Sequence, residues 1–190
     1  MSKDLTKERI LDAVSRRMLK SGYRKVTMDE IARDLTMSKN TIYRYFPSKV
    51  EIAEALFERL KNEINHEISL IEESHSDPYE IISKNVFFLQ QRLSPWYDHF
   101  LVDVKSELPD LWSRFAAFRN EKISRIQSLV EQGIKKGQFR KVNPALAVRL
   151  YMGAVDEVLN PEFLAKERIS FSDALQGVLE IWSNGVCLKK

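Results

Sequence analysis

Three helix-start signals lie close together in the N-terminal third of the chain, and they constrain the fold more than any other feature. Thr27 is followed three residues later by Glu30, and Ser48 by Glu51, which is the spacing of a capping box. Ser38 is a third N-cap candidate between them. The helices between these signals are short, and because isolated short helices are marginal in water, they must pack against neighbours. The segment therefore predicts a cluster of short helices joined by tight turns.

The spacing of apolar residues predicts where each helix of this cluster lies. Steps of three and four residues indicate a first helix that begins after Thr6 and ends at Gly22. A second helix of about eight residues follows from Thr27, and a third covers residues 39–46. The fourth, which begins at Ser48, is long. This arrangement is typical of a helix-turn-helix held between a first and a fourth helix.

The rest of the chain carries similar helix-start signals. Three pairs place a capping side chain before a proline, a residue favoured at the first helical position. These pairs, predicted to start helices five, six and eight, are Asp77-Pro78, Ser94-Pro95 and Asn143-Pro144. Helix seven is predicted from about Asp110 to Lys136, helix eight is predicted to end at Asn160, and helix nine runs from about Ser172 to Val186. Because no alternating strand pattern appears, we expect an all-α fold of about nine helices.

Positive charge is concentrated in the N-terminal third. The whole chain has a net charge of +3, but residues 1–60 hold 13 Lys and Arg against 9 Asp and Glu, whereas residues 61–190 hold 17 against 18. This polarity is expected if the N-terminal end meets a polyanion.

The third short helix has a polar face that suits the major groove of DNA. At about 100° per residue, Ile42 and Phe46 point inward together. The opposite face and its flanks are then formed by Asn40, Thr41, Tyr43 and Arg44. Arginine pairs with guanine, asparagine with adenine, and threonine offers a methyl group to thymine. Any soluble helix exposes polar residues, so an ordinary solvated surface is the competing interpretation.

Three motifs follow one another in this region. They are Gly22-Tyr23, then Val26-Thr27-Met28-Asp29-Glu30-Ile31-Ala32, then Ser38-Lys39-Asn40-Thr41-Ile42-Tyr43-Arg44-Tyr45-Phe46-Pro47-Ser48-Lys49. Their order and spacing resemble the DNA-binding signature of TetR-family transcriptional regulators. The resemblance implies an N-terminal helix-turn-helix DNA-binding domain at residues 1–47 and a C-terminal helical effector-binding and dimerisation domain at residues 48–190.

The DNA contacts expected here come from the resemblance and from the outward face of the third helix. Together they give Thr27, Lys39, Asn40, Thr41, Tyr43, Arg44, Tyr45 and Lys49 as DNA-binding residues. Lys39, Tyr43 and Lys49 would hold phosphates. The chain departs from the family pattern at Thr36, where the family often has glycine, and at Asn40, where it often has another small residue. The family pattern is therefore the weakest guide to the turn at Thr36, and Asn40 is expected to alter which bases are read.

In the family the C-terminal body binds an effector and its last two helices form a dimer. Residues 133–139, followed by Asn143-Pro144, look like the family's usual end of helix seven and start of helix eight. Helices eight and nine each carry a broad apolar stripe, and two such pairs could build a four-helix interface about a two-fold axis. The candidate dimer residues are Tyr151, Val155, Val158, Leu175, Val178 and Trp182. Packing inside one chain is the alternative role for the same stripes.

A homodimeric repressor released from a palindromic operator by a small apolar or aromatic effector is expected by analogy with the family. Two heads on a palindrome must sit ~34 to 36 Å apart or a multiple of that distance, so an effector that tilts helix four would alter the spacing. The candidate pocket residues are Phe88, Trp96, Phe100, Trp112, Phe115 and Tyr151. Aromatic residues at helical spacing more often form a core. The alternative function is an effector-independent DNA-binding scaffold of the same fold, controlled by a protein partner.

Other classes of protein are disfavoured by what the chain lacks. No nucleophile with a base, metal cage, paired carboxylates or phosphate loop is recognisable, so we expect neither enzymatic activity nor a cofactor. His99 and Asp103 stand four residues apart, but a metal site is not predicted from them. No apolar run approaches the ~20 residues of a membrane span, and the charged N-terminus lacks a secretory signal. A cytoplasmic location without a membrane partner is therefore expected.

Overall fold

The computed structural model describes residues 3–96 and 100–188, and these ranges contain ten helices. The helices are α1 (Lys3–Lys25), α2 (Met28–Leu35), α3 (Lys39–Tyr43), α4 (Lys49–Ser74), α5 (Pro78–Trp96), α6 (Val102–Glu107), α7 (Pro109–Lys135), α8 (Pro144–Val158), α9 (Pro161–Glu167) and α10 (Phe171–Val186). The described residues form no strand, only an isolated bridge between Phe139 and Cys187. The fold is all-α, as the sequence predicts.

Besides the end of α3, three helix boundaries differ from those expected. Thr6 lies buried inside α1 and does not cap it. Ser94-Pro95 does not start a helix, because α5 continues through Pro95 to Trp96 and α6 begins only at Val102. Asn160 begins a helix that was not expected, because its side chain accepts a hydrogen bond from the Glu162 N–H at 2.9 Å and so caps α9. Asparagine followed by proline is a start signal there, as it is at Asn143.

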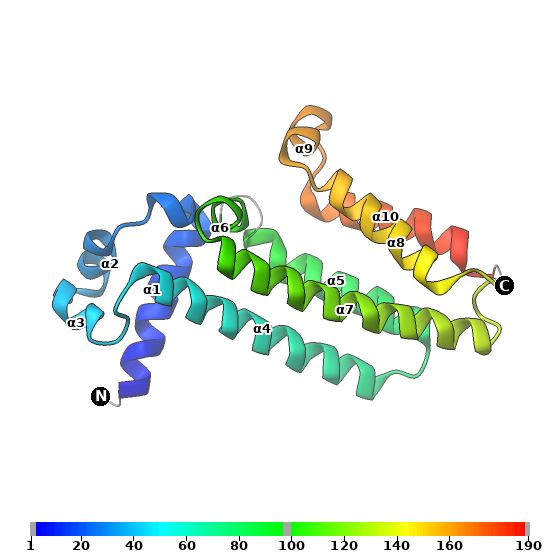
Figure 1. Cartoon of the computed structure of the whole chain (residues 1–190), viewed down its shortest axis with the longest axis horizontal. Helices are drawn as coiled ribbons and strands as arrows, with labels where there is room; N and C mark the ends of the chain where they lie inside the picture. Colours follow the sequence, from blue (N-terminus) through cyan, green and yellow to red (C-terminus); the bar gives the residue numbers. More distant parts are fainter. Residues whose placement is uncertain (1–2, 97–99, 189–190) are drawn as a thin grey trace. The chain divides into compact units, whose positions relative to one another are not determined.

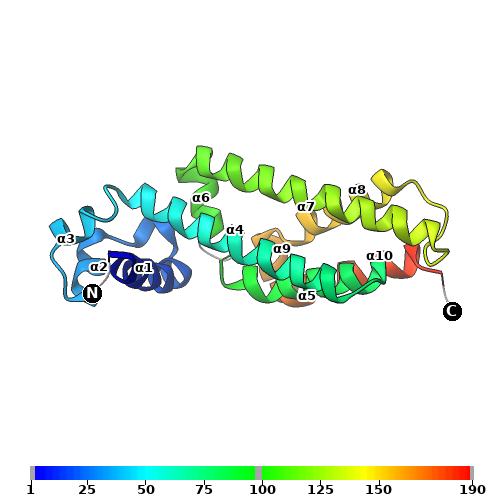
Figure 2. The ribbon, with the colours of Figure 1, turned by 90° about the horizontal axis from the view of Figure 1, so that it is seen from below.

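The chain divides into two compact units, one of residues 1–64 and 95–116, the other of residues 65–94 and 117–190. In the first unit α1, α2 and α3 gather around a common core (Figures 1 and 2). Fully buried apolar side chains of this core are Ile10, Val14, Met18, Ile31, Ile42, Ile52 and Leu56. Gly22, with φ 82°, interrupts α1 in a conformation that favours glycine. The short helices are therefore held by packing, as their length requires.

In the second unit α8 and α10 lie side by side, joined through α9 (Figure 1). The Trp182 Nε1–H of α10 donates a hydrogen bond to the Ala147 carbonyl of α8 at 2.8 Å, and the rings of Tyr151 and Trp182 lie 5.4 Å apart. After α7, Gly137 takes a positive φ of 68°, in agreement with its expected position at the helix end. Within the described residues, no helix combines the length and apolar character that crossing a membrane requires.

Candidate nucleic-acid interface

Helix α2 begins at the capping box expected from Thr27 and Glu30. The Glu30 N–H donates to the Thr27 hydroxyl at 3.3 Å, and the Thr27 N–H donates to a Glu30 carboxylate oxygen at 3.0 Å. The Thr27 hydroxyl also donates to that carboxylate at 3.0 Å. These bonds hold the pKa of Glu30 below its usual value, chiefly through the backbone N–H of Thr27. Thr27 is therefore placed at the start of α2 with its hydroxyl occupied inside the chain.

The turn between α2 and α3 depends on an unusual backbone conformation at Thr36. This residue has φ 53° and ψ 43°, the left-handed region in which glycine is favoured, and its N–H donates to the Arg33 carbonyl at 3.2 Å. Threonine thus adopts here the conformation that glycine provides at no steric cost. The departure from the family pattern at this position leaves the left-handed turn in place.

Helix α3 is shorter than expected but faces the way the sequence predicts. It ends at Tyr43 and not at Phe46, because Tyr45 N–H bonds to the Ile42 carbonyl in a tighter turn before Pro47, a residue that disfavours helix in the position preceding it. Ser38 caps the helix by accepting from the Thr41 N–H at 3.0 Å. Ile42 and Phe46 are both buried.

The outward side of α3 carries the polar residues expected there. Asn40, Tyr43 and Arg44 are exposed, and none of them makes a hydrogen bond or ion pair with another described side chain. Thr41 and Tyr45 are only partly exposed, and the Thr41 hydroxyl lies 2.9 Å from that of Ser38. Three side chains therefore offer unoccupied hydrogen-bonding groups to solvent.

The two lysines of the expected interface are engaged within the chain. Lys39 Nζ lies 2.6 Å from Asp29 Oδ1, and this hydrogen bond raises the pKa of the Lys39 amine. Lys49 Nζ lies 4.2 Å from the centre of the Tyr23 ring and donates to the Arg24 carbonyl at 3.4 Å. Burial lowers the pKa of Lys49, against the opposing effect of nearby carboxylates. Sequence reasoning did not foresee either partner, because both belong to other elements.

The six expected pocket residues are divided between the two compact units. Trp96 and Phe100 are buried and pack edge to face, with ring centres 5.0 Å apart. Trp112 stacks on Phe115 at 5.5 Å, and Phe115 also meets Phe57. Phe88 and Tyr151 belong to the other compact unit, where Phe88 is partly exposed and Tyr151 packs on Trp182. The pocket stays a prediction.

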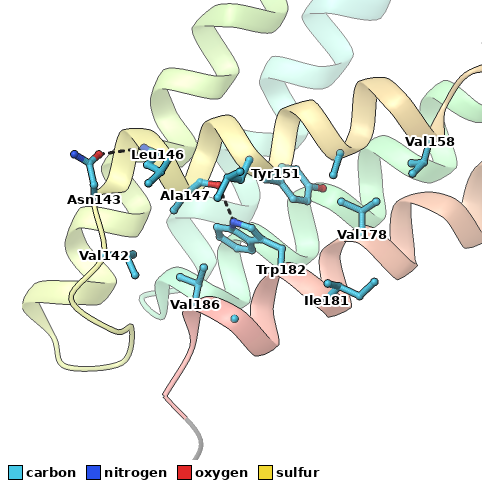
Figure 3. A pocket seen from close by; sticks show the side chains of 13 residues that line it. Val142, Asn143, Leu146, Ala147, Tyr151, Val158, Val178, Ile181, Trp182 and Val186 are labelled. Atoms are coloured by element: carbon cyan, nitrogen blue, oxygen red, sulfur yellow. Dashed lines mark hydrogen bonds between the residues drawn. The ribbon is translucent and has the colours of Figure 1, made fainter.

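An apolar groove of about 500 Å³ runs along α8 and α10 (Figure 3). Of the expected dimer residues, Tyr151, Val158, Val178 and Trp182 line it, whereas Val155 and Leu175 are buried elsewhere in the unit. Its exposed large apolar residues were not in that set: they are Leu146, Leu150 and Ile181. Trp182 is only 9% exposed and Ile181 78% exposed, although they are neighbours on α10.

No group of three or more potential metal ligands occurs among the described residues. His99, which was considered with Asp103 for a metal or polar ligand, lies outside the described residues. Asp103 itself accepts a hydrogen bond from the Arg24 backbone N–H at 2.8 Å.

Comparison with known proteins agrees with the helix-turn-helix. Residues 10–56 match the model of a family described as "Bacterial regulatory proteins, tetR family". The chain is 26% identical, over 94% of both chains, to the uncharacterized HTH-type transcriptional regulator YvaF of Bacillus subtilis.

Solved structures extend the likeness to the whole fold. A transcriptional regulator of the TetR/AcrR family from Thermobifida fusca has a TM-score of 0.74 at 19% identity, covering 95% of this chain and 97% of that one. A putative regulator from Saccharomonospora viridis, in complex with choline, has a TM-score of 0.80 at 17% identity, covering 98% and 100%. Residues 10–56 therefore match the DNA-binding region of the TetR family, and the chain as a whole is similar to an HTH-type transcriptional regulator and has the fold of TetR/AcrR regulators.

Proposed function

We propose that this regulator is a homodimeric repressor that binds a palindromic operator through α3 and leaves it when a small molecule binds the body. The observation that carries the proposal is the outward side of α3, where Asn40, Tyr43 and Arg44 offer unoccupied polar groups while Ile42 and Phe46 are buried. The site of action would be the cytoplasm.

The polar residues divide by the part of DNA that they suit. Arg44 can donate two hydrogen bonds to one guanine, and Asn40 can pair with adenine, so these two would read bases. Lys39, Tyr43 and Lys49 would hold phosphates, which position the protein without reading sequence. Thr27, Thr41 and Tyr45 would contribute from the edges of the same surface.

A second copy of the chain is the proposed occupant of the groove on α8 and α10. Helices α8 and α10, which together form the α8–α10 hairpin, expose Leu146, Leu150 and Ile181. Nearly all of the residues that line the groove are apolar. Two hairpins together would form a four-helix interface. A palindromic operator also requires a two-fold dimer, so the two parts of the proposal support each other.

The effector would be a small apolar or aromatic molecule bound in the helical body. The aromatic side chains of Trp96, Phe100, Trp112 and Phe115 supply apolar surface, and a regulator of the same fold is known in complex with a small molecule, choline. An effector must bind the free and DNA-bound conformations with different affinity in order to release the operator. Release can be measured by adding small apolar and aromatic compounds to the preformed DNA complex. If none of a broad set binds the protein, the effector-independent scaffold is the better account.

Operator binding is tested by titrating the protein against duplexes from the DNA upstream of its own coding sequence. We expect tight binding to one of them and weak binding to a scrambled duplex of equal length. Arg44→Ala should cost ~1 to 3 kcal/mol on that duplex, while Tyr43→Phe should weaken both duplexes alike. Unchanged affinity and specificity in both variants would refute the proposed role of α3.

A further inference from the structure

Lys39, a cation expected to meet a phosphate, is paired with a carboxylate of its own chain. Its Nζ lies 2.6 Å from Asp29 Oδ1, and the two side chains are 47% and 65% exposed. Asp29 lies in the first turn of α2 and Lys39 is the first residue of α3, so the ion pair joins the two helices of the helix-turn-helix. The amine that would bind DNA is already occupied by an anion.

We propose that Asp29 is a positioning residue that lowers DNA affinity, because its carboxylate takes the place of the phosphate that Lys39 would bind. DNA then has to displace Asp29 before Lys39 can reach a phosphate. The inference rests on the proposed function, since it requires Lys39 to face DNA.

The neighbouring acid, Glu30, is held in a different way. Its carboxylate accepts hydrogen bonds from the N–H and the hydroxyl of Thr27 and lies 3.6 Å from Arg17 Nη1, so it is committed to the start of α2. Asp29 has Lys39 as its only ion-pair partner among the described residues. Asp29 is therefore the acid of this turn that can be released when DNA arrives.

The exchange is feasible because the ion pair is weak and DNA is a strong competitor. An exposed ion pair shifts an equilibrium by a factor of only about 1.5 to 5. A phosphate of duplex DNA offers the same charge within a dense array of charges, and binding it releases a condensed counterion. Once displaced, Asp29 is an unpaired carboxylate near a polyanion. It should oppose binding to every sequence alike, since phosphates carry no sequence information.

The test measures the affinity of Asp29→Asn for an operator duplex and for a scrambled duplex over a range of salt concentrations. We expect the variant to bind both duplexes about three to ten times more tightly at 0.1 M salt. The slope of the logarithm of the DNA association constant against the logarithm of the salt concentration should become more negative by up to about one. The reason is that Lys39 then binds a phosphate without competition from a carboxylate. Asp29→Glu, which keeps the carboxylate, should restore wild-type affinity, and Asp29→Ser provides a second neutral variant.

Two controls distinguish the effect of the Asp29–Lys39 ion pair from a general effect of removing a negative charge. Asp156→Asn removes a carboxylate that is ion-paired to Arg119 in the other compact unit, and should leave affinity and slope unchanged. In a Lys39→Gln background the gain from Asp29→Asn should be clearly smaller. Weaker or unchanged binding by Asp29→Asn, or an equal gain without Lys39, would overturn the inference. A wild-type protein that does not prefer its operator over the scrambled duplex would instead overturn the proposed function.

Discussion

Helix α3 and the α8–α10 hairpin expose opposite kinds of surface. The buried side of α3 is apolar and its outward side is polar, with Asn40 and Arg44 available to a ligand. The hairpin buries an apolar side that includes Trp182, and its outward side, at Ile181, is apolar as well. The side-chain chemistry of α3 is enough to suggest DNA as its partner. Both sides of the α8–α10 hairpin are apolar, so the side that would face a partner can be identified only from the burial of each residue.

The largest expected effect is on dimerisation, in a variant of Ile181. If the outward side of the hairpin is the dimer interface, Ile181→Asp buries an unpaired carboxylate there, which costs several kcal/mol, and the two-fold axis places two copies in the interface. We expect the dissociation constant of the dimer to rise at least about a thousandfold, roughly 4 kcal/mol. Sedimentation equilibrium measures it.

The matched control for that change is Leu70→Asp, which introduces the same charge at an exposed leucine of α4. It should leave the dimer intact. A dimer that survives Ile181→Asp would show that the hairpin is not the interface.

The next largest effect is expected at Trp182, the neighbour of Ile181 with the opposite role. Trp182→Phe removes the hydrogen bond from Nε1–H to the Ala147 carbonyl and leaves a gap beside Tyr151 (Figure 3). The free energy of unfolding should fall by ~1 to 2 kcal/mol, measured by urea denaturation at constant protein concentration. Association should change far less than in Ile181→Asp. Equal loss of association in both variants would mean that Trp182 also belongs to the interface.

These two residues indicate how far sequence analysis reaches. The caps at Thr27 and Ser38, the inward direction of Ile42 and the start of α8 were predictable, because each depends on residues a few positions apart. The partners of Lys39 and Lys49 were not, because Asp29 and Tyr23 lie on other elements. The α9 helix was not predictable in the same way, because Asn160-Pro161 fits the end of α8 as well as the start of a further helix. On α10, apolar residues occur on both sides, so periodicity could not separate Trp182 from Ile181.

A smaller gain is expected from Thr36→Gly in the turn of the helix-turn-helix. The left-handed conformation costs a residue with a Cβ ~1 to 2 kcal/mol, part of which glycine loses again through the flexibility of the unfolded chain. The free energy of unfolding should rise by ~0.5 to 1 kcal/mol in chemical denaturation. Thr36→Ala keeps the Cβ and serves as the control. A Thr36→Gly protein no more stable than Thr36→Ala would show that the turn is not strained.

The smallest effect concerns pH and the polar contacts that hold α2. The pKa of Asp34 is lowered chiefly by its hydrogen bond from Arg17, and the pKa of Glu30 by the Thr27 N–H. A lowered pKa means that the folded state binds a proton less tightly than the unfolded state, so this stabilisation is lost as pH falls through the folded pKa values. The melting temperature should therefore fall when the pH is lowered below the range in which carboxyl groups ordinarily titrate. Arg17→Met should show a shallower drop, and an identical profile would contradict this role of Arg17.

The most direct test of the account is the base preference of α3. Selection of duplexes from a random pool by the wild-type protein should enrich a palindrome whose half-sites are spaced by one helical turn or a multiple of it. Arg44→Ala should lose the preference at one symmetric pair of positions and keep the rest, while Lys39→Gln should bind every duplex more weakly with the same preferences. A random pool with no enriched sequence, or an Arg44→Ala protein with the wild-type preferences, would contradict the claim that the outward side of α3 reads DNA.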